Sequence, residues 1–194
     1  EAGVTNLEGL EYAGNLSDLT IYRETIESLE PISNLKNLTR ITISYSTITE
    51  LPITFHKDVQ LVNLSIIDTI ISDINFVKEM NSLETITISD AGIADISPLA
   101  NATGLKSINA RGNEISDISV LEDMNELEVI GFQDNLIDDI SPLTELPKLY
   151  SVNLSYNPVL NLKALETLPR LEEVTVYKFH DETKFLILDQ VDKL

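Results

Sequence analysis

A leucine recurs along this chain at an almost constant interval, and this constrains the fold more than any other feature. The interval is 22 residues at every step except from Leu38 to Leu61, where it is 23. With each leucine taken as position 1 of a repeat, positions 4 and 6 are apolar in all eight repeats, and position 11 in the first seven. Such self-similarity predicts units that bury their apolar faces only by stacking on neighbours. The leucines are Leu16, Leu38, Leu61, Leu83, Leu105, Leu127, Leu149 and Leu171.

Each repeat has the pattern of a strand followed by a short helical turn. Positions 3 to 7 alternate polar and apolar residues, the period of a strand with one buried face. In residues 96–99, Ser97 stands where an N-cap belongs and Pro98 at the first helical position; Ser141 and Pro142 repeat this arrangement. We therefore predict an α/β solenoid of leucine-rich repeats. It is a right-handed superhelix with a parallel concave β-sheet and short 3-10 or helical turns on the convex side.

The repeat pattern divides the chain into three parts. Residues 1–15 match the second half of a repeat and are predicted to be the end of an N-terminal cap with a partial repeat, so we expect further residues before Glu1. Residues 16–176 hold the leucine-rich repeats of about 22 residues. Residues 177–194 depart from the pattern and are predicted to close the C-terminal end of the core.

Position 9 of such repeats is normally asparagine, because its amide bonds the main chain of the bend. Only Asn113, Asn135 and Asn157 obey, and Ala91 cannot make such bonds. We therefore expect the N-terminal half to be less regular than the C-terminal half.

The charge excludes several kinds of partner. The chain has 32 acidic and 13 basic residues, a formal net charge of −19. Such a charge repels phosphate backbones and anionic lipid, so we expect neither nucleic-acid binding nor membrane insertion. No apolar run approaches the roughly 20 residues of a membrane span. The absence of cysteine excludes disulfides, thiol nucleophiles and zinc–thiolate sites, and fits both the cytosol and the surface of bacteria that avoid disulfides.

Two repeats and the opening segment resemble the internalin family, surface proteins of Gram-positive bacteria. The repeats read Ile-Ser-Asp-Ile-Ser-Val-Leu at 115–121 and Ile-Asp-Asp-Ile-Ser-Pro-Leu at 137–143. The opening residues 4–16 are similar to the junction between an internalin cap and its first repeat. The resemblance implies an extracellular adhesion domain, often followed by an immunoglobulin-like domain and a wall anchor.

Outward residues at positions 3, 5, 7 and 8 are predicted to line the concave face. Their charges nearly balance, so most of the net charge lies elsewhere. This face also holds four of the six tyrosines, and Tyr and Arg are enriched where interfaces bind most strongly. The other explanation is that strands simply favour tyrosine and threonine. The candidate partner-binding residues are Tyr22, Arg23, Arg40, Tyr45, Ile67, Arg111, Gln133, Tyr156, Tyr177 and Lys178.

Aspartates at position 13 form a second candidate site, made up of Asp73, Asp95, Asp117 and Asp139. Stacked carboxylates suit Ca²⁺, but no loop wraps round an ion here. We favour local hydrogen bonds to the turns that follow and predict no metal and no cofactor.

No catalytic arrangement can be assembled from the sequence. The two histidines, His56 and His180, form no recognisable set with a nucleophile, and phosphate-loop and zinc-protease motifs are absent. We expect a protein that is not an enzyme.

We therefore expect a monomeric protein-binding module of an internalin-like virulence protein, secreted or held on a Gram-positive cell surface, that adheres to a host cell-surface protein. The alternative is an intracellular leucine-rich-repeat scaffold that regulates a partner enzyme such as a phosphatase.

Overall fold

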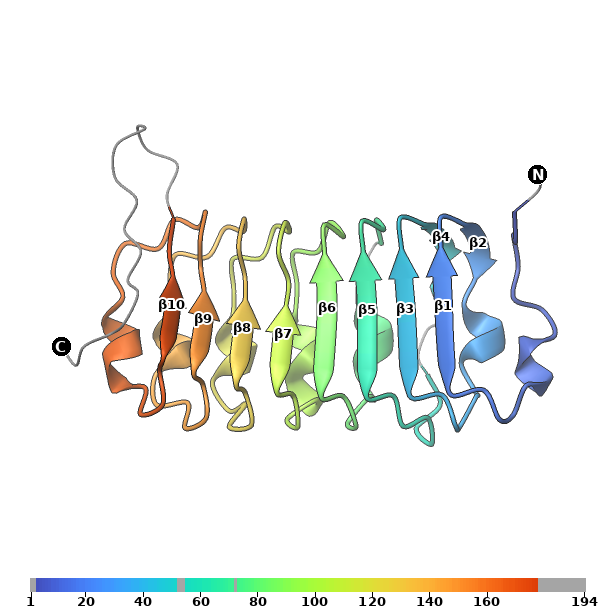
Figure 1. The fold of residues 1–194 in the computed structure, drawn as a ribbon, viewed down its shortest axis with the longest axis horizontal. Coiled ribbons are helices and arrows are strands. Elements are labelled where there is room, and N and C mark those ends of the chain that lie inside the picture. Colours follow the sequence, from blue (N-terminus) through green and yellow to red (C-terminus); the bar gives the residue numbers. More distant parts are fainter. Residues whose placement is uncertain (1–2, 52–54, 72, 178–194) are drawn as a thin grey trace.

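The computed structural model describes residues 3–51, 55–71 and 73–177. Eight strands, one from each repeat, form a single parallel sheet in chain order (Figure 1). The strands are β1 (Asp18–Tyr22), β3 (Arg40–Ser44), β5 (Asn63–Ile67), β6 (Thr85–Ser89), β7 (Ser107–Asn109), β8 (Val129–Gly131), β9 (Ser151–Asn153) and β10 (Glu173–Thr175). Together with the turns behind it, this sheet confirms the predicted leucine-rich-repeat solenoid.

Neighbouring strands pair with equivalent positions in register. Leu19 lies opposite Ile41, and Ile108 opposite Ile130. The longer second repeat does not disturb this register, because Arg40 still pairs with Asn63, 23 residues later. The additional residue is therefore accommodated outside the sheet.

Short 3-10 helices lie on the side of the solenoid opposite the sheet (Figure 1). In the fourth repeat, Ile96, Leu99 and Ala102 point inward and are buried, as predicted. The predicted N-cap is wrong: Ser97 is the first helical residue, and its backbone N–H donates to Asp95 Oδ1 at 2.8 Å. The helices are η1 (Leu10–Tyr12), η2 (Glu30–Ile32), η3 (Asn75–Val77), η4 (Ser97–Asn101), η5 (Ser119–Leu121), η6 (Ser141–Leu143) and η7 (Lys163–Thr167).

The core is one continuous stack of aliphatic side chains between the sheet and the helices. Positions 1, 4, 6 and 11 supply most of it, and Ile86, Ile88 and Ile93 of one repeat are all at most 1% exposed. Each such side chain contributes roughly 1.5–3 kcal/mol on burial. Phe132 fills position 6 where other repeats have smaller residues.

The position-9 asparagines join one repeat to the next through buried hydrogen bonds. Asn135 Nδ2 donates to the carbonyl of Ala110 in the preceding repeat at 2.8 Å and to that of Phe132 in its own at 3.2 Å. Its Oδ1 accepts from the N–H of Ile115 at 3.0 Å. Asn113 and Asn157 repeat this pattern. The amides thus satisfy main-chain groups that the bend would leave buried and unpaired.

The N-terminal half replaces these amides with hydroxyls and additional strands. Thr69 Oγ1 donates to the carbonyl of Ile67 at 3.0 Å and accepts from the N–H of Ser46 at 3.1 Å. A second parallel sheet pairs β2 (Thr25–Ser28) with β4 (Thr47–Glu50). The N-terminal half thus departs from the repeat in its bends, whereas its strands in the main sheet are longer: the first four span five residues and the last four span three.

The first residues of the described chain continue the stack beyond the first full repeat. Leu7 is buried, and the carbonyl of Thr5 accepts from the N–H of Glu27 at 2.8 Å. The predicted boundaries at 15/16 and 176/177 stay predictions, and the closing segment lies outside the described residues after Tyr177. Within the described part, no helix has the length and apolar character needed to cross a membrane.

Candidate functional site

A column of residues with left-handed backbone runs along the edge where the strands end. Position 8 has a φ between +48° and +67° in each of the first seven repeats. In each, its N–H donates to the position-7 carbonyl of the following repeat, at 2.6–3.0 Å. This conformation costs a residue with a side chain roughly 1–2 kcal/mol, and only Gly, Asn and Asp adopt it readily. The left-handed column consists of Arg23, Tyr45, Asp68, Asp90, Gly112, Asp134 and Tyr156.

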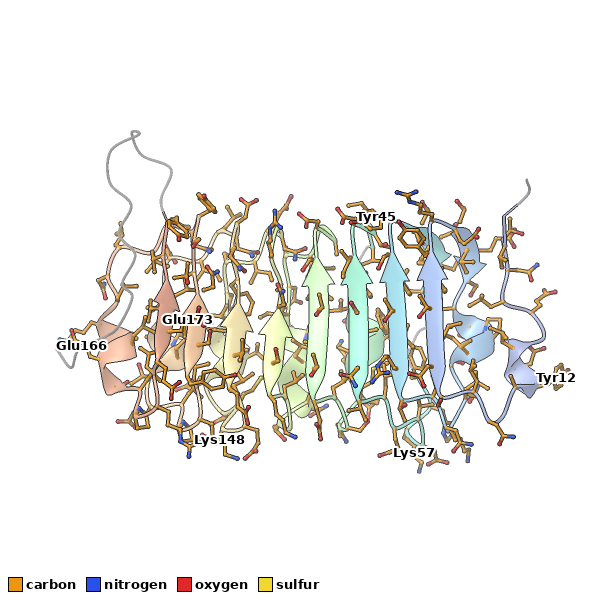
Figure 2. The ribbon with its side chains drawn as sticks, viewed as in Figure 1. Tyr12, Tyr45, Lys57, Lys148, Glu166 and Glu173 are labelled. Carbon is orange, nitrogen blue, oxygen red and sulfur yellow. The ribbon has the colours of Figure 1, made fainter. Side chains whose placement is uncertain are left out.

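Position 8 therefore does not face outward from a strand, as the sequence pattern predicted, but turns away at the end of the sheet. Tyr45, labelled in Figure 2, lies at this edge beside the arrowheads of the strands. We call the left-handed column together with the position-7 residues the rim. The position-7 residues are Tyr22, Ser44, Ile67, Ser89, Arg111, Gln133, Ser155 and Tyr177.

The rim carries a pair of tyrosines near each end. Tyr22 and Tyr45 meet edge to face with ring centroids 5.7 Å apart. Tyr156 and Tyr177 stack with centroids 6.3 Å apart. In both pairs one ring comes from position 7 of a terminal repeat and the other from position 8 of its neighbour. Tyr22, Tyr45 and Tyr156 are 52%, 54% and 40% exposed, so each pair presents aromatic surface to solvent.

The predicted arginines are not all brought together. The guanidinium of Arg23 lies 5.1 Å from the ring centroid of Tyr22, a cation–π contact that extends the first tyrosine pair. Arg40 begins β3 at the opposite edge of the sheet, where it forms an ion pair with Asp18 at 2.8 Å. Lys178 lies outside the described residues.

The remaining predicted residues lie on the rim between the tyrosine pairs. Arg111 is exposed, whereas Ile67 is half-buried between Ser44 and Ser89 rather than exposed as the sequence suggested. Gln133 is also half-buried, and its Oε1 has no hydrogen-bond partner within the described part of the chain.

The sheet between the two edges offers small polar groups rather than large anchors. Its central row, position 5, holds Thr20, Thr42, Ser65, Thr87, Asn109, Gly131, Asn153 and Thr175. Large aromatic contacts are thus concentrated at the rim.

Two exposed apolar residues beside the rim were not among the partner-binding residues predicted from the sequence. Ile70 and Leu136, both at position 10, are 71% and 56% exposed. The sequence could have indicated them, because position 10 is not a core position of the repeat: Gly92 and Glu114 occupy it in other repeats. An apolar residue there adds contact area at the same edge as the tyrosines.

Charged side chains form ion pairs between repeats at one edge of the sheet, and within the described part of the chain the acids at the other edge do not. At the edge where the strands begin, neighbouring repeats are joined by the ion pairs Lys36–Asp58, Lys106–Glu84 and Lys148–Glu126, with N–O distances of 2.7, 2.9 and 2.6 Å. Lys57 and Lys148 mark this edge in Figure 2. At the rim, Asp68, Asp90 and Asp134 form no ion pair with any described residue.

The position-13 aspartates serve the turns, which is the interpretation favoured from the sequence. Asp73 accepts from the N–H of Asn75 at 2.7 Å. Asp117 and Asp139 accept from the N–H of Ser119 and Ser141 at 2.8 Å, and these bonds, reinforced by the serine hydroxyls, hold the pKa of both carboxyls below the usual value. The hydroxyl and N–H of Ser97 likewise lower the pKa of Asp95. Among the described residues no group of three such side chains is placed to hold a metal ion.

His56 is exposed, with Nδ1 3.7 Å from Asp58 Oδ2 in the longer repeat. His180 lies outside the described residues.

Comparison with known proteins identifies relatives of this solenoid. No protein-family model matches the chain, and no curated protein matches it in sequence. The structure of internalin C2 from Listeria monocytogenes is 30% identical with a TM-score of 0.79, covering 90% of this chain and 76% of its own. A leucine-rich-repeat protein of Leptospira interrogans, LIC12759, is 20% identical with a TM-score of 0.77, over 89% and 46%. A TLR13–ssRNA13 complex matches at 15% identity and a TM-score of 0.70, over 90% and 31%. The chain spans less than half of the last two proteins.

Proposed function

Because this chain belongs to the internalin family of leucine-rich-repeat proteins, we propose that it binds a protein through its rim, as the adhesion domain of a bacterial surface protein. The solenoid is a protein-interaction module; the rim, the cell-surface location and a host protein as the partner are the proposal. The rim concentrates exposed aromatic surface, which supplies much of the binding free energy at protein interfaces.

One observation carries the choice of the rim. Tyr45 and Tyr156 occupy left-handed positions that Gly, Asn or Asp fill without strain. Strain of this kind, roughly 1–3 kcal/mol for each residue, is concentrated at functional sites. Tyrosine at these two positions, each next to a second tyrosine, is therefore explained better by binding than by the preference of strands for aromatic residues.

The fold itself also admits nucleic acid, since TLR13 has been seen in complex with a single-stranded RNA. The charge of this chain favours a protein partner instead. A formal charge of −19 opposes the approach of phosphates. The rim adds Arg23 and Arg111 but also three aspartates.

A binding assay on intact cells tests the proposal. The fluorescently labelled domain is incubated with cultured host epithelial cells and bound fluorescence is measured by flow cytometry. The variant Tyr45→Asn/Tyr156→Asn removes one ring from each pair, and we expect binding to fall about tenfold or more. The matched control is Tyr12→Asn/Tyr150→Asn, which removes two exposed tyrosines away from the rim and should bind like the wild type. Equal binding by all three proteins would reject the rim as the binding site.

The intracellular scaffold is the alternative, and the same protein distinguishes it. Rim-dependent capture of a phosphatase or other enzyme from cytosol, with no rim-dependent binding to intact cells, would favour the scaffold. We propose that the domain itself has no catalytic role.

A further inference from the structure

Three acidic side chains of the rim have no ionic partner among the described residues, while the ion pairs between repeats lie at the opposite edge of the sheet. Asp68 and Asp134 are exposed and Asp90 is half-buried. None of the three carboxylates has an ion pair or side-chain hydrogen bond within the described residues, in contrast to the four inter-repeat pairs at the edge where the strands begin, Arg40–Asp18 included. Ion pairs thus join stacked repeats at one edge of the sheet, whereas the acids of the rim have none within the described residues.

Repulsion between these carboxylates destabilises the folded protein when no partner is bound. Asp68 and Asp90 occupy the same position of adjacent repeats, just past the ends of β5 and β6, and like charges so placed repel each other. The carboxylate of Asp90 lies against Gly112, where an added Cβ would collide with Oδ1. The left-handed backbone explains a preference for Asp over most residues, but Asn and Gly fit that backbone equally well without charge. The backbone conformation alone therefore does not account for the charge at these positions.

The flanking tyrosines have surfaces that suit the same kind of ligand. The ring of Tyr22 already holds a guanidinium, that of Arg23, at 5.1 Å from its centroid. Tyr45, which meets that ring edge to face, is 54% exposed. Exposed aromatic faces attract Lys and Arg side chains as well as apolar groups.

From these observations we propose that the protein partner presents Lys or Arg side chains to Asp68, Asp90 and Asp134, between the two tyrosine pairs. The inference rests on the proposed function of the rim. Tyr45 and Tyr156 are five repeats apart, about 24 Å at the usual strand spacing. The basic segment of the partner is thus expected to be about seven residues of extended chain in length. Exposed Arg111, between Asp90 and Asp134, limits how many cations of the partner this part of the rim can bind. An acidic or neutral residue of the partner is expected opposite it.

Labelled peptides of about ten residues, long enough to span both tyrosine pairs, test the charge requirement. Three peptides share one apolar and aromatic framework and differ in having lysine, glutamine or glutamate at alternate positions. Affinity is measured by fluorescence anisotropy at low and physiological salt. We expect the lysine peptide to bind most tightly and to weaken as salt rises.

Two variants with the same charge separate a local site from general attraction. Asp68→Asn/Asp90→Asn/Asp134→Asn should weaken the lysine peptide about tenfold, since Asn keeps the left-handed backbone and removes only charge. Glu79→Gln/Glu122→Gln/Asp138→Asn loses three charges on the exposed surface away from the rim and should retain nearly wild-type affinity. Equal weakening in both variants, or no preference for lysine over glutamine, would overturn the inference. If the glutamine peptide binds equally well and is lost in Tyr45→Asn/Tyr156→Asn, the rim still binds protein and only the basic partner is rejected. If neither substitution at the rim affects any peptide and the cell-binding assay also fails, the proposed function is rejected as well.

Discussion

Tyr45 and Tyr156 occupy the same position of two repeats and share a left-handed backbone, with φ values of 53° and 60°. Each contacts a position-7 tyrosine of a neighbouring repeat, Tyr22 for the first and Tyr177 for the second. The two ends of the rim are thus built alike, although the chain that forms them is separated by more than a hundred residues.

Replacing Tyr45 by Asn should leave the free energy of unfolding within about 1 kcal/mol of wild type. Relief of the left-handed strain, roughly 1–2 kcal/mol, offsets the loss of a ring pair that contributes about 0.5–1.5 kcal/mol. Tyr22→Asn loses the same pair without any relief, because Tyr22 is in an extended strand. Urea denaturation should therefore show a larger loss for Tyr22→Asn. Equal losses would mean that the backbone at position 45 carries no strain.

Replacing Gly112 by Ala should lower the free energy of unfolding by about 1–2 kcal/mol or more. Its φ is +67°, and the new Cβ would collide with the carboxylate of Asp90. Gly14→Ala is the control, since nothing lies within 4 Å of its Cβ position. A second variant, Gly112→Ala/Asp90→Ala, removes the collision and should recover only part of the loss. Wild-type stability of Gly112→Ala would contradict this account of the column.

Replacing Asn135 by Ala should lower the free energy of unfolding by about 3 kcal/mol, because several buried main-chain groups lose their partners. Asn125→Ala is the control: this exposed asparagine donates to the carbonyl of Asp123 at 3.3 Å. Thermal or urea unfolding followed by circular dichroism measures both. A loss no larger than that of the control would show that water replaces the amide in the bend.

The turn aspartates should make stability fall in acid. Hydrogen bonds lower the folded-state pKa of Asp95, Asp117 and Asp139. Their contribution is complete above the unfolded pKa of about 4 and is lost as pH falls through the lowered folded pKa. Substituting Asn at all three keeps an acceptor oxygen without its titration. Urea midpoints measured between about pH 5 and pH 2 should therefore fall less steeply in the Asn variant.

The control for this measurement is Glu114→Gln/Glu122→Gln/Asp138→Asn, which removes three charges and no turn hydrogen bond shown by the structure. If both triple variants have the same acid profile, net charge rather than the turns determines the loss of stability.

The periodicity predicted the strands and the core well, because burial repeats with the sequence: Ile86 and Ile88 could be assigned inward from spacing alone. The rim was less predictable. Position 8 continues the polar pattern of the strand, and only the combination of Asp68, Asp90 and Gly112 indicated a left-handed residue. The contact between Tyr22 and Tyr45 depends on side chains from different repeat positions, which a column-by-column comparison of repeats does not reveal.

The capping of the turns was predicted with the wrong residue for a similar reason. Ser97 belongs to a residue type that caps helices, but a carboxylate two residues earlier is better placed to accept its N–H. A side-chain acceptor at the start of the turn was predicted correctly, but the residue that supplies it, Asp95, lies two positions before Ser97.

The in-register pairing of the sheet has a consequence for how such a surface can change over evolution. Because each strand pairs with its equivalent in the next repeat, even across the 23-residue step from Arg40 to Asn63, whole repeats can be gained or lost without altering the remaining pairs. The separation of the tyrosine pairs is therefore quantised in steps of about 4.8 Å. Duplication or deletion of one repeat would adjust the length of partner surface that fits between them, while both pairs stay intact.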